Sequence, residues 1–467
     1  MRLCQTVVGD IVTGLFCALA TLGVVPIIRC ARGGPAEMVS RELETRLREA
    51  LSQRGALFPP DVAAQRPLLA LFDRSFDLAP AVQHVWTYAP LAADVLAMKL
   101  NRVTLPGGGA GAAKKSFELD VETDPFWAAQ LGAQFPKVAE EVEAELGRYK
   151  ASVAALNRAA EAAAGGLDAP ADAGAPGGGL LSAVSSLPEL TERKRLIDKH
   201  TNIATALLGA IKARGLDTYA AVEEDLLAGR GDRAAVAQLL SATGKGSAED
   251  KVRLAIVALL SAEAPPTAAE AEAVDAALRA SGADAAPLAY VRQMRTFNLT
   301  AGGGGGSMAS MGAAMGAPGG AGGAGAGGVL DWADKLYGQG LTAVTKGVKS
   351  LLAGNRTLAL ARAVENLLEG RPGTEAETFL TLDPRAPPGA QPQQLPQQGA
   401  APPRRDVIAF VVGGGCALEA RALAEAAARP SASGAPPRAI AYGATEMLSG
   451  PDFLAQLAEL ARGGGGM

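Results

Sequence analysis

Residues 67–73 read PLLALFD, an apolar run of strand length that ends in a carboxylate. The same pattern recurs in three other stretches, which we also expect to be buried strands: GVVPIIR at 23–29, DVIAFVVGGG at 406–415 and PRAIAYGAT at 437–445. Each is followed by a helical pattern, which is typical of βαβ units and a mostly parallel sheet. Because the four strands gather at opposite ends of the chain, the sequence predicts one α/β domain in two halves.

The middle of the chain is predicted to be helical. No convincing strand pattern occurs from about residue 107 to residue 371, and apolar residues recur at a spacing of three to four in 139–164, 187–215, 248–263 and 328–352. Stretches rich in glycine or proline cannot bury enough apolar surface to offset the entropy of ordering, so we expect them to be loops or linkers. The predicted organisation is a first α/β half at 1–105, a helical domain at 106–371 with glycine-rich loops at 164–180 and 301–328, a Pro/Gln-rich linker at 372–405, and a second α/β half at 406–467.

The composition argues against several classes of protein. A formal net charge of -4 and a pI near 5.6 disfavour a protein that neutralises nucleic-acid backbones. The chain holds two histidines and four cysteines and has no C-x-x-C pair, so we expect neither a zinc site nor a disulfide framework. The spread of cysteines therefore fits a reducing, cytosolic environment.

An apolar run near the N-terminus, IVTGLFCALATLGVVPII at 11–28, is almost long enough to cross a bilayer. Pro26 divides this run, and the β-branched VVPII around it is followed by Arg29 and Arg32, as in a buried helix that leads into a buried strand. The pattern favours a soluble protein, with a membrane anchor and a signal peptide as the alternatives.

Asp73 and Asp77 are the first candidates for chemistry, because two carboxylates just past a strand end suit acid/base work or Mg²⁺ binding. Neither a nucleophile nor a Walker-type lysine accompanies them, and DRSFDLAP at 73–80 also fits a strand, a turn and a helix N-cap. The glycines Gly413–Gly415 suggest a phosphate loop, but Leu418 stands where G-x-G-x-x-G needs its third glycine. Structural roles are expected, and an α/β enzyme with a phosphate or metal site at these residues is the alternative.

Four further residues have side chains that could take part in catalysis, and we expect them to be structural as well: His84, Trp86, Tyr88 and Cys416. A catalytic triad needs a nucleophile near the histidine, and G-x-S-x-G does not occur in the sequence. Large aromatic side chains at one helix start are typical of a domain junction. A cysteine at a helix N-terminus can have a lowered thiol pKa, but a buried small residue is the commoner case.

The segment LPELTERKRLIDKHTNIATALLGAIKARG at 187–215 is the most informative helix. Every seventh residue is apolar, at Leu190, Ile197, Ala204 and Ile211, and Thr201 and Leu208 take the interleaved positions. The adjacent surface is densely charged, and Pro188 stands where a helix would start or kink. Such a pattern belongs either to a core helix or to a docking rail for another helix.

These segments together resemble the Sec/Munc (SM) family of SNARE regulators, and within it most of all the Sly branch. The resemblance rests on 67–103, on SSLPELTERKRLIDKHTNIATALLGAIKARGLDTYAAVEEDLL at 185–227 and on DVIAFVVGGGCALEARAL at 406–423, and it extends to 15–39 and 442–460. It implies an arch-shaped protein with no enzymatic activity, in which a helical domain interrupts a split α/β domain. The family's first domain, which clasps the Qa-SNARE, has no counterpart here, so no residue inherits its N-peptide site.

The resemblance also implies partners and a place in the cell. The partners are SNARE proteins, namely a Qa-SNARE (a syntaxin), an R-SNARE and the assembled SNARE bundle, with no nucleic acid and no cofactor. The implied role is to template SNARE assembly for vesicle docking and membrane fusion in ER-to-Golgi and intra-Golgi transport. A cytoplasmic monomer is expected, peripheral on ER and Golgi membranes and transport vesicles through its SNAREs.

In this family a helical hairpin receives R-SNARE helices, and a proline at its bend governs whether it extends. The similar region here is 181–213, with Pro188 at the matching position, and the segment 165–179 falls where the Sly branch has a regulatory loop, although its composition departs from a folding sequence. The resemblance implies SNARE contacts at Leu187, Pro188, Glu189, Arg193, Arg195, Asp198 and His200.

Overall fold

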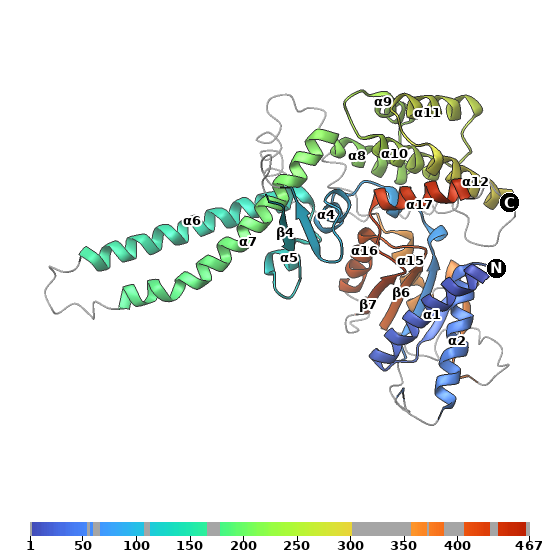
Figure 1. The fold of residues 1–467 in the computed structure, drawn as a ribbon, viewed down its shortest axis with the longest axis horizontal. Helices are drawn as coiled ribbons and strands as arrows, with labels where there is room; N and C mark the ends of the chain where they lie inside the picture. The colour runs from blue at the N-terminus through green and yellow to red at the C-terminus, as the bar shows by residue number, and fades with distance from the viewer. Residues whose placement is uncertain are drawn as a thin grey trace. The chain divides into compact units, whose positions relative to one another are not determined.

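A five-stranded sheet lies at the centre of the α/β part of the chain (Figure 1). Its strands are β1 (Ile27–Cys30), β2 (Leu68–Asp73), β5 (Leu380–Leu382), β6 (Asp406–Val412) and β7 (Ala439–Ala444), in the order β5-β1-β2-β6-β7. β1, β2, β6 and β7 run parallel, and β5 pairs antiparallel with β1 at the edge. The four predicted strands and the mostly parallel sheet are confirmed. The computed structural model describes residues 2–53, 57–58, 66–106, 113–165, 178–300, 356–370, 373–386, 406–429 and 438–463.

Helices cover both faces of this sheet, which explains why its strands are apolar throughout. Leu69 and Leu71 of β2 join the core formed with α1 (Arg2–Leu22) and α2 (Pro35–Ser52). The alternate residues Leu68, Ala70 and Phe72 join the core formed with α15 (Ala359–Glu369) and α16 (Ala417–Ala428). Successive side chains of β2 therefore pack into two separate cores, one on each face of the sheet.

The apolar N-terminal run is divided as Pro26 predicts, because α1 ends at Leu22 and β1 begins at Ile27. One stripe of α1 is buried in the core against α2 and the sheet, at Val8, Val12, Leu15 and Leu19. Among the described residues, the segment Gln5–Leu22 of α1 is long and apolar enough to span a membrane by these two measures alone. Core helices pass the same test, and the buried stripe gives α1 a place in the core.

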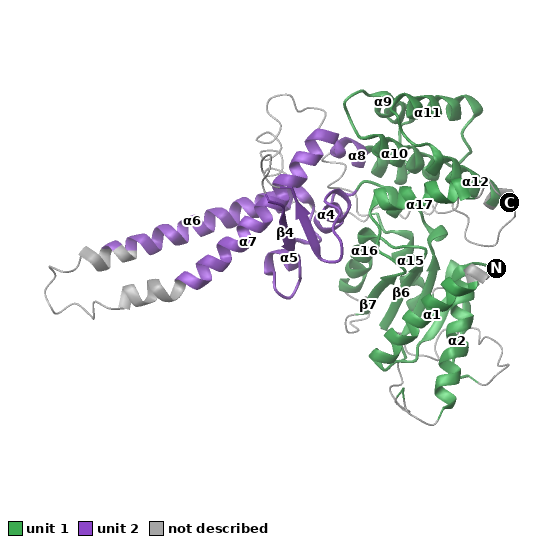
Figure 2. Cartoon of the chain, in the orientation of Figure 1, with its two compact units in different colours: residues 1–84, 222–318, 353–467 green, residues 85–221, 319–352 purple. Residues whose placement is uncertain are grey.

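The chain divides into two compact units (Figure 2). Unit 1 comprises 1–84, 222–318 and 353–467, and unit 2 comprises 85–221 and 319–352. The predicted boundaries at 371 and 405 need correction. The helix α15, placed before 371, packs on the sheet, and both the 3-10 turn Glu375–Thr378 and the strand β5 lie in the predicted linker. Half of the predicted helical region therefore belongs to the sheet-containing unit.

Unit 1 also contains a helical layer beside its sheet. Its elements are η1 (Arg74–Phe76), α3 (Ala79–Val82), α9 (Arg233–Ser241), α10 (Ala248–Ser261), α11 (Ala268–Ala280), α12 (Ala286–Thr300) and α17 (Gly450–Gly463). The helix α10 begins with a capping box between Ser247 and Asp250 and is buried along most of its length. Gly450 at the start of α17 packs so closely on Arg253 that an added Cβ would lie 2.6 Å from Cζ of that guanidinium.

Unit 2 consists of short elements at the base of two long helices. These elements are α4 (Tyr88–Val95), β3 (Arg102–Leu105), β4 (Lys115–Glu118), α5 (Pro125–Gln130), α6 (Phe135–Gly165), α7 (Gly178–Arg214) and the first half of α8 (Leu216–Leu227). The antiparallel pair β3–β4 was not predicted, since its strands have four residues each and face solvent on most positions. The predicted helix at 328–352 and the glycine-rich segment 301–328 lie outside the described residues.

Candidate partner-binding site

The helices α6 and α7 pack along each other and form the long arms of unit 2 (Figure 2). We call them the α6–α7 hairpin. The region 181–213, predicted as a hairpin by resemblance, is a single helix in the structure, and its antiparallel partner is α6. The correction follows from helix length, because α7 runs unbroken through Pro188. Residues 166–177, which contain most of the predicted regulatory loop, lie outside the described residues.

The base of the α6–α7 hairpin is fixed by a buried polar cluster. Nε2 of His200 is 3.0 Å from Oδ2 of Asp124, and its Nδ1 is 3.0 Å from the hydroxyl of Tyr88. Lys199 forms an ion pair with the same carboxylate, and the indole of Trp127 stacks on the imidazole. Although burial raises the pKa of Asp124, hydrogen bonds from His200 and Lys199 hold that pKa well below its ordinary value.

His200 is 1% exposed, so its predicted role as a direct SNARE contact is wrong. It anchors α7 instead. Asp124 also caps α5, because its Oδ1 accepts the backbone N–H of Trp127 at 2.9 Å. The sequence contained a signal for this cap, an aspartate followed by proline at the start of a helix, but no signal for its contact with α7.

The buried seam of α7 follows only part of the predicted heptad. Ile197, Ala204 and Ile211 are buried as expected, but Thr201 is exposed. Ile203 and Leu207 occupy the buried interleaved positions instead. A straight helix with 3.6 residues per turn drifts away from a strict seven-residue repeat, so the contact face shifts between adjacent positions.

Residues 187–198 of α7 have several exposed side chains. Leu187 is 49% exposed, and four other predicted contact residues are also exposed: Pro188, Glu189, Arg195 and Asp198. Arg195 pairs with Glu192 of the same helix at 2.6 Å. The structure therefore groups five of the seven predicted contacts on the exposed surface of one helix.

Arg193 instead joins the two arms. Its Nη2 lies 2.8 Å from Oε2 of Glu145 on α6, and Arg148 lies 2.8 Å from the other oxygen of that carboxylate. The hydrogen bonds from Arg148 and Arg193 lower the pKa of Glu145. These two α6 residues were not predicted, although their spacing of three on a helix is a sequence signal for an ion pair.

Pro188 lies inside a continuous helix, where it cannot donate to the carbonyl of Val184. A proline in a helix interior costs about 3 kcal/mol relative to alanine. Three residues later, the hydroxyl of Thr191 donates to the carbonyl of Leu187 at 2.8 Å, a contact that often bends helices. The helix is therefore locally weakened next to exposed side chains such as that of Leu187.

The carboxylates of the alternative enzymatic site have structural partners. Oδ1 of Asp73 accepts the backbone N–H of Ala36 at the start of α2, at 2.7 Å. Oδ1 of Asp77 accepts the backbone N–H of Ala79 at the start of α3, at 3.1 Å. Burial raises the pKa of both carboxyl groups. Each carboxylate holds a helix N-terminus, which was expected for Asp77, whereas the contact of Asp73 with α2 was not predicted.

The backbone N–H groups of the glycine turn after β6 are also hydrogen-bonded within the protein. The N–H groups of Gly413 and Gly414 donate to the hydroxyl of Thr445 at 3.2 and 2.9 Å, and that of Gly415 donates to the carbonyl of Glu446 at 2.8 Å. Gly413 and Gly414 have φ of 96° and 94°, so glycine is required here by the backbone. These donors are not available for a phosphate.

Cys416 and the adjacent ion pair complete this region. Burial raises the pKa of the Cys416 thiol, so it has no thiolate character. Arg74 forms a buried, two-pronged ion pair with Glu419, at 2.7 and 2.9 Å, and the hydroxyl of Tyr442 donates to Glu419 at 2.7 Å. The network joins η1, β7 and α16 and holds these elements together.

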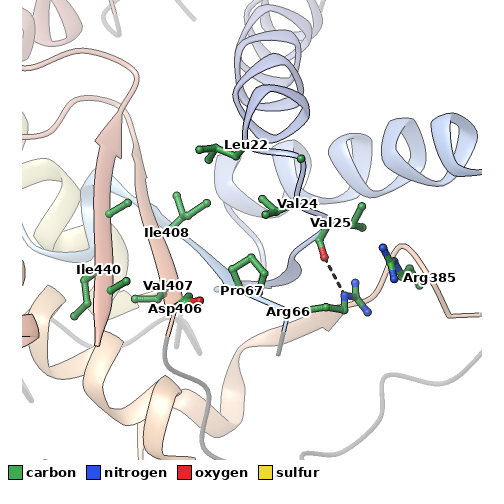
Figure 3. Close-up of a pocket in the computed structure, with 13 residues that line it drawn as sticks. Leu22, Val24, Val25, Arg66, Pro67, Arg385, Asp406, Val407, Ile408 and Ile440 are labelled. Atoms are coloured by element: carbon green, nitrogen blue, oxygen red, sulfur yellow. Dashed lines mark hydrogen bonds between the residues drawn. The ribbon is translucent and has the colours of Figure 1, made fainter. Parts of the chain in front are cut away.

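A cavity of about 580 Å³ lies elsewhere, at the amino ends of the parallel strands (Figure 3). Its lining is mainly apolar and includes Leu22, Val24 and Ile440, with Arg66 hydrogen-bonded to the carbonyl of Val25. Asp73 is the last residue at the other end of β2 and does not line this cavity. Among the described residues, no group of three or more His, Cys, Asp or Glu side chains is placed to hold a metal ion.

The structure defines a class of protein in which an α/β unit is interrupted by a unit that carries a long helical hairpin. The family model described as "Sec1 family" matches residues 2–456. The SEC1 family transport protein SLY1 of Oryza sativa is 43% identical over 98% of this chain and 68% of its own length. The human Sec1 family domain-containing protein 1 is 36% identical over 98% of this chain and 71% of its own length. This chain belongs to the Sec1 family.

Solved structures agree with this assignment. The crystal structure of Sly1p in complex with an N-terminal peptide of Sed5p matches with a TM-score of 0.73 and 25% identity, over 99% of this chain and 69% of that one. The SM protein Vps45 in complex with the Qa SNARE Tlg2 matches with a TM-score of 0.66 and 18% identity, over 98% and 70%. The predicted family, its Sly branch and the fold class are confirmed.

Proposed function

We propose that this protein is a SNARE-binding regulator of vesicle docking and membrane fusion in ER-to-Golgi and intra-Golgi transport. Its membership of the Sec1 family supports this role, as do the transport proteins it resembles and the Qa-SNARE complexes of its structural relatives. The single observation that carries the mechanism is the segment 187–198 of α7, which presents a helical surface with exposed side chains.

The mechanism is to reduce the entropic cost of SNARE pairing. Free SNARE segments are disordered, and ordering them consumes part of the energy gained on association. A helical rail held at its base by Asp124 and His200 gives a partner helix a fixed register. We therefore assign Leu187, Pro188 and the exposed charges that follow them to the partner surface.

The pattern of charges on the exposed surface of α7 provides its specificity for a partner helix. Within the part of the chain that the structure describes, the side chains of Glu189, Lys194 and Asp198 have no hydrogen bond or ion pair, and all three are exposed. A partner helix with charges of opposite sign at matching positions gains attraction, and a wrong register brings like charges together. Arg193 is committed to Glu145 and serves to hold the two arms together.

The proposal also includes the expected lack of catalysis and cofactor, the oligomeric state and the location in the cell. The protein acts without catalysis and without a cofactor, as a monomer in the cytoplasm. Its association with ER and Golgi membranes and transport vesicles is peripheral and depends on the SNAREs that it binds.

The test is binding of the full chain to immobilised Qa-SNARE, R-SNARE and assembled SNARE bundle, with three variants beside it. Pro188→Ala restores a backbone donor and favours the continuous α7, so it should bind R-SNARE or the bundle about fivefold more tightly or better. Asp198→Lys reverses an exposed charge on the rail and should weaken binding about tenfold.

Glu459→Lys is the matched control, since Glu459 is an exposed carboxylate on α17 in unit 1 and should have no effect. If a folded chain binds none of the three ligands, the proposed function is wrong. Equal binding by Asp198→Lys and Glu459→Lys would show that α7 is not the partner surface.

A further inference from the structure

His84 lies between two carboxylates in the interior of unit 1. Its Nδ1 is 2.8 Å from Oε1 of Glu223 on α8, and its Nε2 is 3.0 Å from Oδ1 of Asp250 on α10. All three side chains are at most 2% exposed. The proposed SNARE-binding surface does not use these residues, so they have a role of another kind.

Backbone groups fix the orientation of both carboxylates. The backbone N–H of His84 donates to Oε2 of Glu223 at 2.5 Å, and the backbone N–H of Ser247 donates to Oδ2 of Asp250 at 2.7 Å. Because an N–H can only donate, each carboxylate is held as an acceptor with its second oxygen toward the imidazole.

This arrangement requires a particular protonation state of His84. Both ring nitrogens must donate if both contacts are hydrogen bonds, and only the imidazolium has two N–H groups. A neutral imidazole would direct a lone pair at a buried carboxylate, which is costly in a medium of low dielectric constant. The geometry therefore calls for a buried positive charge on His84.

The other charged groups around His84 come from α10 and from the segment before α15. Arg253 donates to the carbonyls of Val82 and Gln83 at 2.6 and 2.9 Å, and Arg356 donates to the side chain of Gln83 at 2.9 Å. Burial and Arg253 lower the pKa of His84, whereas Glu223 and Asp250 raise it, and the pKa of His84 is raised overall from 6.5. The buried charged groups that act on His84 are therefore two carboxylates and the guanidinium of Arg253.

The position of this cluster in the chain suggests its structural role. His84 is the last residue of unit 1 before the chain enters unit 2, and Glu223 is the second residue after the chain returns at Val222. We propose that His84, Glu223 and Asp250 form a proton-dependent staple, a set of hydrogen bonds that holds together the two points where the chain leaves unit 1 and returns to it. The staple is closed while His84 carries both ring protons, and it opens when His84 loses one of them.

The pH dependence of the staple has a definite sign. A group whose pKa is higher in the folded protein contributes stability that is fully present below the unfolded value, here 6.5. That contribution is lost as the pH rises through the folded pKa. The staple therefore opens toward alkaline pH, opposite in sign to a histidine that is buried in its neutral form.

The chain has only two histidines, which makes a direct test possible. The full chain, labelled with ¹³C and ¹⁵N at histidine, is titrated by NMR from about pH 5.5 to 9.5, and Glu223→Gln identifies the His84 ring signals. We expect two protonated ring nitrogens on His84 at pH 7 and a midpoint above 6.5. Glu223→Gln should lower this midpoint by about one pH unit or more, a tenfold change in proton affinity.

Glu224→Gln is the matched control, because Glu224 neighbours Glu223 on α8 and has no side-chain partner within the described part of the chain. If Glu223→Gln fails to fold, Asp250→Asn gives the same comparison. Hydrogen exchange of residues 79–90 and 216–227, corrected for intrinsic rates, should rise about tenfold once the wild-type midpoint is passed. A midpoint at or below 6.5, a neutral His84 at pH 7, or unchanged protection across the midpoint would overturn the proposal.

Discussion

Asp124 shows how much one residue contributes to the α6–α7 hairpin. It is fully buried, caps α5 through the backbone of Trp127, and faces both Lys199 and His200 of α7. Removing one partner of such a cluster leaves the other charged groups buried without compensation, which is more damaging than losing a surface ion pair. The attachment of α7 to unit 2 therefore depends on this carboxylate.

We expect Asp124→Asn to destabilise unit 2 by about 3–5 kcal/mol, because it keeps the cap but removes the charge that compensates Lys199. Urea unfolding measures the loss, monitored by tryptophan fluorescence, to which Trp127 contributes. The stabilisation by Asp124 depends on pH, because the pKa of its carboxyl group is lower in the folded protein than in the unfolded chain. This stabilisation is present above about pH 4 and is lost as the pH falls below the ordinary carboxyl pKa of 3.8. Asp120→Asn, in the preceding turn, should change stability by less than about 1 kcal/mol, and an equal loss in both variants would contradict the assignment.

At the scale of elements, prediction from the sequence succeeded where a pattern is local. Runs such as PLLALFD identify buried strands because both faces are apolar, and Asp77 could be assigned to the start of the next helix. The contact of Asp73 with the start of α2, 37 residues earlier in the chain, could not be predicted. The short strand β5 and the pair β3–β4 have too few residues to show a period. The partners of His84 and His200 were out of reach, since Glu223 and Asp124 are 139 and 76 residues away in the sequence.

Among the described residues, a partly exposed ion pair between Arg193 and Glu145 joins the two arms of the hairpin. Since exposed ion pairs contribute about 1 kcal/mol or less, Arg193→Ala should leave the melting temperature nearly unchanged. Hydrogen exchange along 140–150 of α6 should nevertheless increase several-fold, because the arms separate more often. Arg195→Ala removes only a pair within α7 and serves as the control. If both variants exchange alike, Arg193 does not join the arms.

At the scale of the whole molecule, the chain contains separate cores. The sheet of unit 1 is covered on both faces by its own helices, whereas unit 2 has an aromatic core around Tyr88, Trp127 and Phe135. The sequence predicted that an α/β domain is split, because its strands lie at both ends. It could not predict that 222–318 joins the sheet-containing unit, since the helical pattern is continuous across that division.

Separate cores predict that the protein does not unfold in one step. Calorimetry of the full chain should show two transitions, and each unit has a buried ionic lock that assigns them. Glu419→Gln weakens the lock with Arg74 and should lower only the transition of unit 1, whereas Asp124→Asn should lower only that of unit 2, each by about 3 kcal/mol or more. Hydrogen exchange at the temperature between the transitions identifies the unit that has opened. A single transition that both variants lower would mean that the units unfold together.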